Sequence, residues 1–138
     1  MNLPPAIRFP SMLRILIADD SAGLRQGMRN LLSEASPQWI ICGESADGED
    51  AVRKTEELCP DVILLDLSIP RLRGLDVVKE LRRKNLSTEV IIISAQDQDV
   101  LDHLARTSGL THAIAKSQLA SDLIPALQSL QRHREELA

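Results

Sequence analysis

Short apolar runs alternate along this chain with longer segments whose apolar residues recur every three or four positions. The short runs are partly β-branched and cover Leu13–Ala18, Trp39–Cys42, Val62–Leu65, Val90–Ile93 and Ala113–Ala115. Strands that are covered on both faces of a parallel sheet have this nearly continuous apolar pattern. The pattern therefore predicts five strands in the interior of one domain.

The longer segments have helical spacing. Their apolar positions are Leu24, Met28, Leu31 and Leu32, then Ala51, Val52 and Leu58, then Leu75, Val78 and Leu81, then Val100, Leu101 and Leu104, and finally Leu123, Leu127 and Leu130. Such spacing predicts five amphipathic helices. Strands and helices that alternate in this way form right-handed crossovers around a parallel sheet with helices on both faces.

The last helix contains Pro125, which lacks an N–H group and clashes with the preceding turn. Only the first turn of a helix tolerates that loss without penalty, because its N–H groups have no intrahelical partner. We therefore expect this helix to begin near Ser121, with Ser121 as its N-cap.

The length and composition fit one domain. The chain has 138 residues, of which 43% are hydrophobic, enough for one core and too few for two. We assign residues 1–12 to a Pro-rich N-terminal tail, which could not pair as a central strand. Residues 13–130 form the domain, and 131–138 are the end of the last helix or a short tail.

The charge balance excludes some classes of partner. The net charge is −4, which gives no basic field to hold a phosphate backbone, so we expect no direct nucleic-acid binding. Met1–Met12 has no continuous apolar stretch, which argues against a signal peptide or a membrane anchor and predicts a cytoplasmic location. Cys42 and Cys59 lack metal-ligand spacing, and we expect reduced thiols without a role.

Reactive side chains lie where four of the apolar runs end. Asp19 and Asp20 follow the first run, Asp66 the third, Ser94 the fourth and Lys116 the fifth. The carboxyl ends of parallel strands form the ligand crevice of an open α/β sheet, so these side chains should converge. Clustered carboxylates repel one another unless a cation neutralises them, and Mg²⁺ is a suitable oxygen-bound cation.

The same pocket suits phosphoryl chemistry. An amine and a hydroxyl beside the cation, here Lys116 and Ser94, could hold two oxygens of a phosphoryl group. A carboxylate in that position can act as a nucleophile and form an acyl phosphate.

Four stretches resemble the receiver domains of two-component response regulators. They occur in the order and spacing of that family, and they are ILIADDS at Ile15–Ser21, DVILLDLSIPRLRGLDVV at Asp61–Val78, IIISA at Ile91–Ala95, and Lys116. The resemblance covers about Leu13–Leu130 and is closest to the receivers of LuxR/NarL-type regulators. It implies a flavodoxin-like α/β fold, a doubly wound five-stranded parallel sheet of order 2-1-3-4-5 with five helices.

The resemblance also implies roles for the residues at the strand ends. Asp66 matches the aspartate that receives a phosphoryl group from a histidine kinase or phosphotransfer protein. Asp19 and Asp20 match the acids that bind Mg²⁺ together with Asp66, and the backbone carbonyl of Ser68 matches a further ligand of that ion.

The remaining matches concern the response to phosphorylation. Ser94 matches the switch hydroxyl, and Lys116 matches the amine that pairs with the phosphoryl group. Pro70 and Gly74 match the turn that shapes the loop after the phosphorylated residue.

One departure from the family concerns the switch. Most receivers have an aromatic residue three positions before the lysine, whereas this chain has Ala113 there, so a rotating ring cannot report phosphorylation. The family's output face, made by the fourth helix, fifth strand and fifth helix, must then respond through backbone and loop shifts. Alternatively, the small Ala113 leaves a groove that a partner side chain fills. A lesser departure is Ser117, where many receivers have proline.

The sequence favours a stand-alone receiver that is not an enzyme and that acts on a downstream protein partner through the output face. A homodimer is compatible with it. Alternatives are the receiver fragment of a longer DNA-binding transcription regulator and a binding module that needs no phosphorylation. A Mg²⁺-dependent phosphohydrolase is less favoured, because such enzymes need an acid two residues after the nucleophile, where this chain has Ser68.

Overall fold

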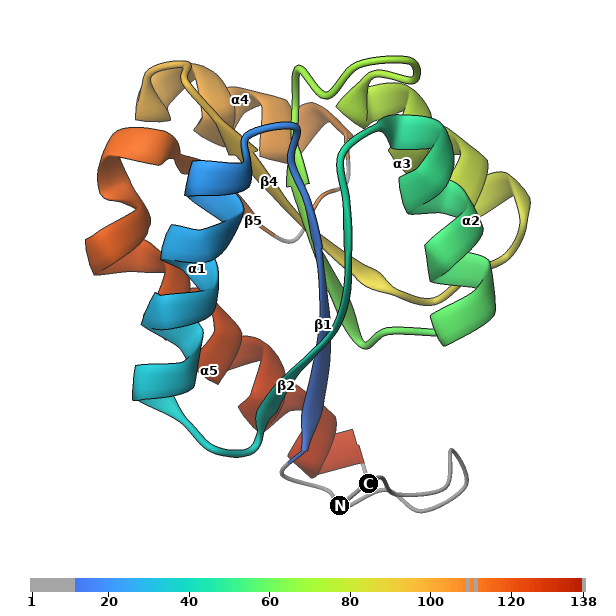
Figure 1. Ribbon diagram of the computed structural model, residues 1–138. Helices are drawn as coiled ribbons and strands as arrows, with labels where there is room; N and C mark the ends of the chain where they lie inside the picture. The colour runs from blue at the N-terminus through green and yellow to red at the C-terminus, as the bar shows by residue number, and fades with distance from the viewer. Residues whose placement is uncertain (1–11, 109, 111, 138) are drawn as a thin grey trace.

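The computed structural model describes residues 12–108, 110 and 112–137, so that the predicted N-terminal tail, except Met12, lies outside the described residues. Five parallel strands form one sheet of order β2-β1-β3-β4-β5 (Figure 1). They are β1 (Leu13–Ala18), β2 (Trp39–Ser45), β3 (Val62–Asp66), β4 (Glu89–Ser94) and β5 (His112–Ala115). The predicted doubly wound, flavodoxin-like sheet is confirmed.

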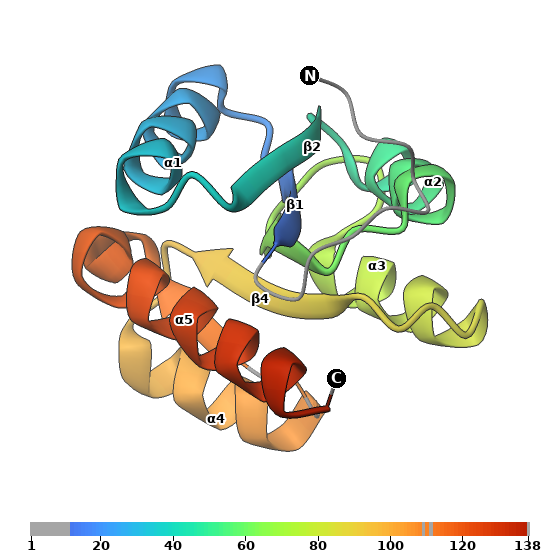
Figure 2. The ribbon, with the colours of Figure 1, turned by 90° about the horizontal axis from the view of Figure 1, so that it is seen from below.

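Helices cover both faces of this sheet. They are α1 (Ala22–Ala35), α2 (Gly48–Leu58), α3 (Gly74–Arg83), α4 (Gln98–Ser108) and α5 (Leu119–Leu137). The first and last helices lie together on one face, while α2 and α3 lie on the other, as Figure 2 shows from below. The side chains of α4 join the core on the α2 and α3 face.

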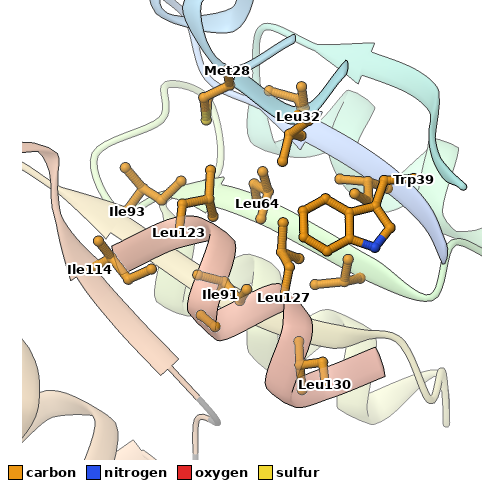
Figure 3. Close-up of a cluster of buried hydrophobic side chains, with 14 of the residues drawn as sticks. Met28, Leu32, Trp39, Leu64, Ile91, Ile93, Ile114, Leu123, Leu127 and Leu130 are labelled. Atoms are coloured by element: carbon orange, nitrogen blue, oxygen red, sulfur yellow. The ribbon is translucent and has the colours of Figure 1, made fainter. Parts of the chain in front are cut away.

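Two apolar cores result from the alternation of side chains along the strands. On β1, Ile15 and Ile17 point toward α1 and α5, whereas Leu16 points toward the opposite face. Figure 3 shows the first core, in which Leu127 of α5 packs near Trp39 of β2. Because β1, β3 and β4 are buried along almost their whole length, the polar residues at their ends are the ones left for chemistry.

The start of α5 differs from the prediction. A 3-10 turn at Lys116–Gln118 leads directly into the helix at Leu119, so Ser121 is not the N-cap and Pro125 lies inside the helix. Both Ser121 and Pro125 are exposed, so water can solvate the carbonyl that the missing N–H leaves unpaired. The helix continues to Leu137, which makes residues 131–137 helical.

Candidate metal centre

The three predicted acids meet at the carboxyl end of the sheet. Carboxylate oxygens of Asp19, Asp20 and Asp66 all lie within 4.8 Å of one another. Asp19 directly follows β1 and Asp66 ends β3, and these two strands are neighbours in the sheet. Asp19 and Asp66 are buried, with exposed fractions of 1% and 2%, whereas Asp20 is exposed. Folding thus creates the convergence that the strand ends predicted.

Lys116 supplies one positive charge to this cluster. Its Nζ atom lies 3.6 Å from Asp19 Oδ2 and 3.7 Å from Asp66 Oδ1. One ammonium cannot balance three carboxylates. Burial raises the pKa of Asp19, and the charges of Asp66 and Asp20 raise it further, although the Ser21 N–H and Lys116 act in the opposite direction.

The donor set fits a hard divalent cation. Asp19 Oδ1 accepts a hydrogen bond of 2.8 Å from the Ser21 backbone N–H, but the buried Oδ2 atom accepts none from the part of the chain that the structure describes. A buried carboxylate oxygen without a hydrogen bond is unfavourable unless a cation binds it. In proteins Mg²⁺ takes oxygen ligands, usually one or two carboxylates together with phosphate oxygens and waters. The residues present therefore fit Mg²⁺.

Ser68 lies beside the cluster. Its backbone N–H and its hydroxyl both donate to Asp66 Oδ1, at 3.2 and 3.3 Å. These contacts fix the first turn of the loop that follows β3. They place the peptide of Ser68, whose carbonyl the resemblance assigns to the metal, next to the central acid.

Two glycines hold that loop in position. The Gly74 N–H donates to Leu67 O at 3.0 Å, and a Cβ atom on Gly74 would lie 2.8 Å from Leu67 Cα. The Gly48 N–H, at the start of α2, donates to Pro70 O at 2.9 Å. A Cβ atom on Gly48 would lie 1.8 Å from Leu72 O, so only glycine fits there. The sequence analysis identified Pro70 and Gly74 but missed Gly48.

Ser94 ends β4, which pairs with β3, so its hydroxyl is on the same edge of the sheet as Asp66. The residue is buried, and its Oγ atom accepts a hydrogen bond of 3.2 Å from the Gln96 N–H. The hydroxyl is therefore tied to the start of the loop that leads to α4.

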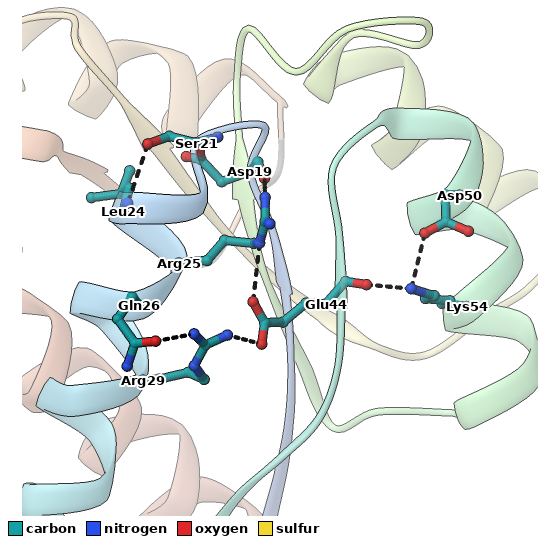
Figure 4. A network of polar contacts seen from close by, with 9 residues as sticks. All are labelled: Asp19, Ser21, Leu24, Arg25, Gln26, Arg29, Glu44, Asp50 and Lys54. Carbon is teal, nitrogen blue, oxygen red and sulfur yellow. Dashed lines mark hydrogen bonds and ion pairs between the residues drawn. The ribbon is translucent and has the colours of Figure 1, made fainter.

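A polar network supports the Asp19 loop from the side of α1 (Figure 4). The Arg25 guanidinium donates to the backbone carbonyl of Asp19 at 2.6 Å and to Glu44 of β2 at 3.0 Å. Arg29 also pairs with Glu44, and Lys54 of α2 donates to the carbonyl of Glu44. Sequence reasoning missed Arg25, because a helical arginine carries no signal of a contact to a loop.

Ala113 of β5 is part of the lining of a surface hollow of about 520 Å³. The hollow lies between α4 and α5, and its lining includes Gln98, Arg106, His112 and Pro125. A hollow is therefore present beside Ala113. That the small side chain creates it, and that a partner fills it, stay predictions.

The chain is similar in sequence to known proteins. A family model described as the response regulator receiver domain matches residues 15–128. The chain belongs to the response regulator receiver family. The nitrate/nitrite response regulator protein NarL of Escherichia coli (strain K12) is 37% identical over 115 residues, which are 82% of this receiver chain and 52% of NarL. The chemotaxis protein CheY of Thermotoga maritima is 29% identical over 119 residues, which are 86% of this chain and 98% of CheY.

A solved structure agrees in fold. The signal receiver domain of the response regulator NarL from Mycobacterium tuberculosis superposes with a TM-score of 0.78 at 28% identity, over 88% of this receiver and 97% of that domain. The chain spans about half the length of the E. coli NarL protein. Among the described residues, no helix is both long and apolar enough to cross a membrane.

Proposed function

We propose that this receiver accepts a phosphoryl group on Asp66 and that the modification changes which protein it binds. The observation that carries the proposal is the buried cluster of Asp19 and Asp66 with Asp20 at its mouth, all within 4.8 Å, and Lys116 beside both buried acids. Family membership supports the same chemistry, since receivers are the signalling modules of two-component systems.

The chemistry starts with the Asp66 carboxylate as nucleophile. It attacks phosphorus in a phosphohistidine of a sensor kinase or phosphotransfer protein, so that an O–P bond forms as the N–P bond breaks. When bound by Asp19, Asp20, Asp66 and the Ser68 carbonyl, Mg²⁺ supplies positive charge to the phosphoryl oxygens. Lys116 is placed to take a second oxygen of that group.

The switch follows from contacts that exist only after phosphorylation. Ser94 ends the strand that pairs with the acceptor strand, and in the modified state its hydroxyl would donate to a phosphoryl oxygen. Lys116 would exchange a carboxylate for a phosphoryl partner. Because these contacts are made in one state only, the phosphoryl group shifts a two-state equilibrium.

We propose a cytoplasmic signalling protein without turnover of small molecules, without direct nucleic-acid contact and without a membrane partner. Its downstream protein partner would bind the face formed by α4, β5 and α5, and a homodimer through that face is compatible with the proposal. The N-terminal receiver of a longer regulator is the second candidate, favoured by the 52% coverage of NarL. Both candidates share the chemistry at Asp66.

The test is intact mass after incubation with Mg²⁺ and acetyl phosphate. We expect a gain of one phosphoryl group that is lost on chelation of Mg²⁺ and absent in Asp66→Asn. The matched control is Asp97→Asn, an exposed acid before α4, which should be modified like the wild type. Modification of Asp66→Asn to the same extent, or continuous release of phosphate with no need for Asp66, would overturn the proposal.

A further inference from the structure

The Gln98 side chain holds the free edge of β5. This strand is at the end of the sheet and pairs only with β4 among the described strands, so its outward backbone groups need other partners. Gln98 Nε2 donates to Ala113 O at 2.8 Å, and the Ala115 N–H donates to Gln98 Oε1 at 3.0 Å. One carboxamide thus makes the pair of bonds that a neighbouring strand would make.

The amide of Gln98 is fully used. Its second N–H group donates to Asp102 Oδ1 at 2.9 Å, one helical turn further along α4. With two donors and an acceptor engaged, the side chain has a single orientation relative to both elements. A glutamine in this arrangement is a fixed connection between α4 and β5 and not a solvated residue at the start of a helix.

The two ends of this connection lie at functional residues. Gln98 is the first residue of α4, and the short loop before it begins at Ser94, whose hydroxyl binds the Gln96 N–H. At the other end, Ala115 directly precedes Lys116, the amine that faces Asp19 and Asp66. The bonds to Ala113 and Ala115 therefore link the switch hydroxyl to the lysine through backbone and one side chain.

We propose that Gln98 is a positioning residue that carries the movement of the Ser94 loop to β5, and so takes the place of the missing aromatic switch. The inference rests on the proposed function, because it needs a phosphoryl group to move Ser94. Hydrogen bonds weaken steeply when their distance and angle change, so β5 must follow when the start of α4 moves. The strand then shifts Lys116 and reshapes the hollow that Gln98 and Ala113 line.

Two variants distinguish the hydrogen bonds of Gln98 from the volume of its side chain. Gln98→Ala removes all three bonds. Gln98→Glu keeps the shape and the acceptor for Ala115, but its carboxylate cannot donate to Ala113 O and it repels Asp102. The matched control is Gln128→Ala, which removes an exposed glutamine from α5. All are made in the full chain.

The measurement is the backbone amide ¹H–¹⁵N spectrum with Mg²⁺, before and after addition of beryllofluoride, an analogue of the phosphoryl group. In the wild type and in Gln128→Ala we expect beryllofluoride to shift the amides beside Asp66 and Ser94 and also those of Ala113 and Ala115. In both Gln98 variants the shifts beside Asp66 should remain. Gln98→Ala should lose the shifts of Ala113 and Ala115, whereas Gln98→Glu, which keeps the acceptor for the Ala115 N–H, should lose the shift of Ala113. Without beryllofluoride, the Ala115 amide of Gln98→Ala should exchange with solvent about 2- to 10-fold faster, the factor expected for one lost hydrogen bond.

The outcomes distinguish the two proposals. If beryllofluoride shifts nothing beside Asp66 in the wild type, the proposed function fails and the coupling falls with it. If the shifts beside Asp66 occur and Ala113 and Ala115 respond in Gln98→Ala as they do in the wild type, the coupling is refuted while the proposed function stands. If Gln98→Ala changes the exchange rate of the Ala115 amide but keeps the shifts that beryllofluoride causes in β5, the coupling is also refuted. Gln98 would then have only a structural role.

Discussion

Gly48→Ala tests how the loop after Asp66 is held. Gly48 begins α2, and its N–H donates to Pro70 O at 2.9 Å. An added Cβ atom would lie 1.8 Å from Leu72 O and 2.8 Å from Leu72 Cβ. Real contacts of this kind are essentially never below 3.0 Å, so the loop and the helix must separate by more than an ångström. The obstacle is a backbone carbonyl, which cannot rotate away as a side chain could.

The expected loss of stability follows from two opposing effects. Forced overpacking of this kind costs about 1–3 kcal/mol, and loss of the Pro70 hydrogen bond adds about 1 kcal/mol. Replacing glycine by alanine in a helix returns at most about 1 kcal/mol. We therefore expect Gly48→Ala to lower the free energy of unfolding by about 1–3 kcal/mol.

Gly27→Ala is the matched control. Gly27 lies in α1, is exposed, and has no atom within 4 Å of an added Cβ. Only the gain in helix propensity remains, so this variant should be more stable than the wild type by about 0.5–1 kcal/mol. The same chemical change should thus have opposite signs at the two positions.

Urea unfolding followed by fluorescence measures both. Trp39 is the one tryptophan of the chain and is buried in the core beside α5, so its emission reports global unfolding. With a slope of about 1–3 kcal/mol per molar urea, the two midpoints should differ by about 0.5–4 M. The loop also carries Ser68, so Gly48→Ala should be phosphorylated more slowly by acetyl phosphate. A Gly48→Ala protein at least as stable as Gly27→Ala would refute the reasoning.

Two further predictions concern charge. Lys116→Met removes the ammonium that lies 3.6 and 3.7 Å from Asp19 and Asp66. Mg²⁺ should then bind several-fold more tightly, because about 1 kcal/mol of repulsion between the ion and the ammonium is lost. Isothermal titration measures the affinity, and the control Lys116→Arg, which keeps the charge, should bind Mg²⁺ nearly as the wild type does. Burial lowers the pKa of His112 below its ordinary 6.5, against the opposing charge of Glu89. The unfolded chain then binds the proton more tightly, so the stability associated with neutral His112 is complete above about pH 6.5 and is lost as the pH falls through the lower folded pKa. His112→Gln should therefore lose less stability than the wild type between pH 8 and pH 5 in urea unfolding, and an equal loss would contradict the assignment.

The sequence predicted those elements whose signal is local. The run Leu13–Ala18 is apolar except for Arg14, and it coincides with β1. The second strand was predicted to end at Cys42 but continues to Ser45, because pairing with β1 and not apolar character defines its last residues. The predicted start of α5 was wrong because the rule for Pro125 considers the backbone alone. Leu119 and Leu123 pack in the core and keep the residues before the proline helical, and this packing outweighs the cost of the proline.

Some residues of the candidate site could likewise be predicted from the sequence, and others could not. Asp19, Asp66, Ser94 and Lys116 could be found because strand ends meet at one edge of a parallel sheet whatever the details of packing. Gly48 and Arg25 could not. Gly48 acts on a segment that lies far away in the sequence, and the contacts of Arg25 with the Asp19 carbonyl and with Glu44 form only in the folded chain. Gly48 is 22 residues from Pro70, whose carbonyl it binds; only coordinates show that a Cβ would not fit.

At Ala113 both the sequence and the folded structure are needed to understand the switch. The sequence shows that the aromatic ring of other receivers is absent, but it cannot show what replaces the ring, because a glutamine at the start of a helix is ordinary. In the structure Gln98 binds the backbone on both sides of Ile114 and so needs no side chain on β5 at all. Because Gln98 binds backbone atoms of β5, this connection is compatible with alanine at position 113. A switch that works by rotation of a ring needs an aromatic side chain there. The small residue and the glutamine are thus two parts of one arrangement, and Ala113→Tyr alone would not restore an aromatic switch while Gln98 still holds the strand.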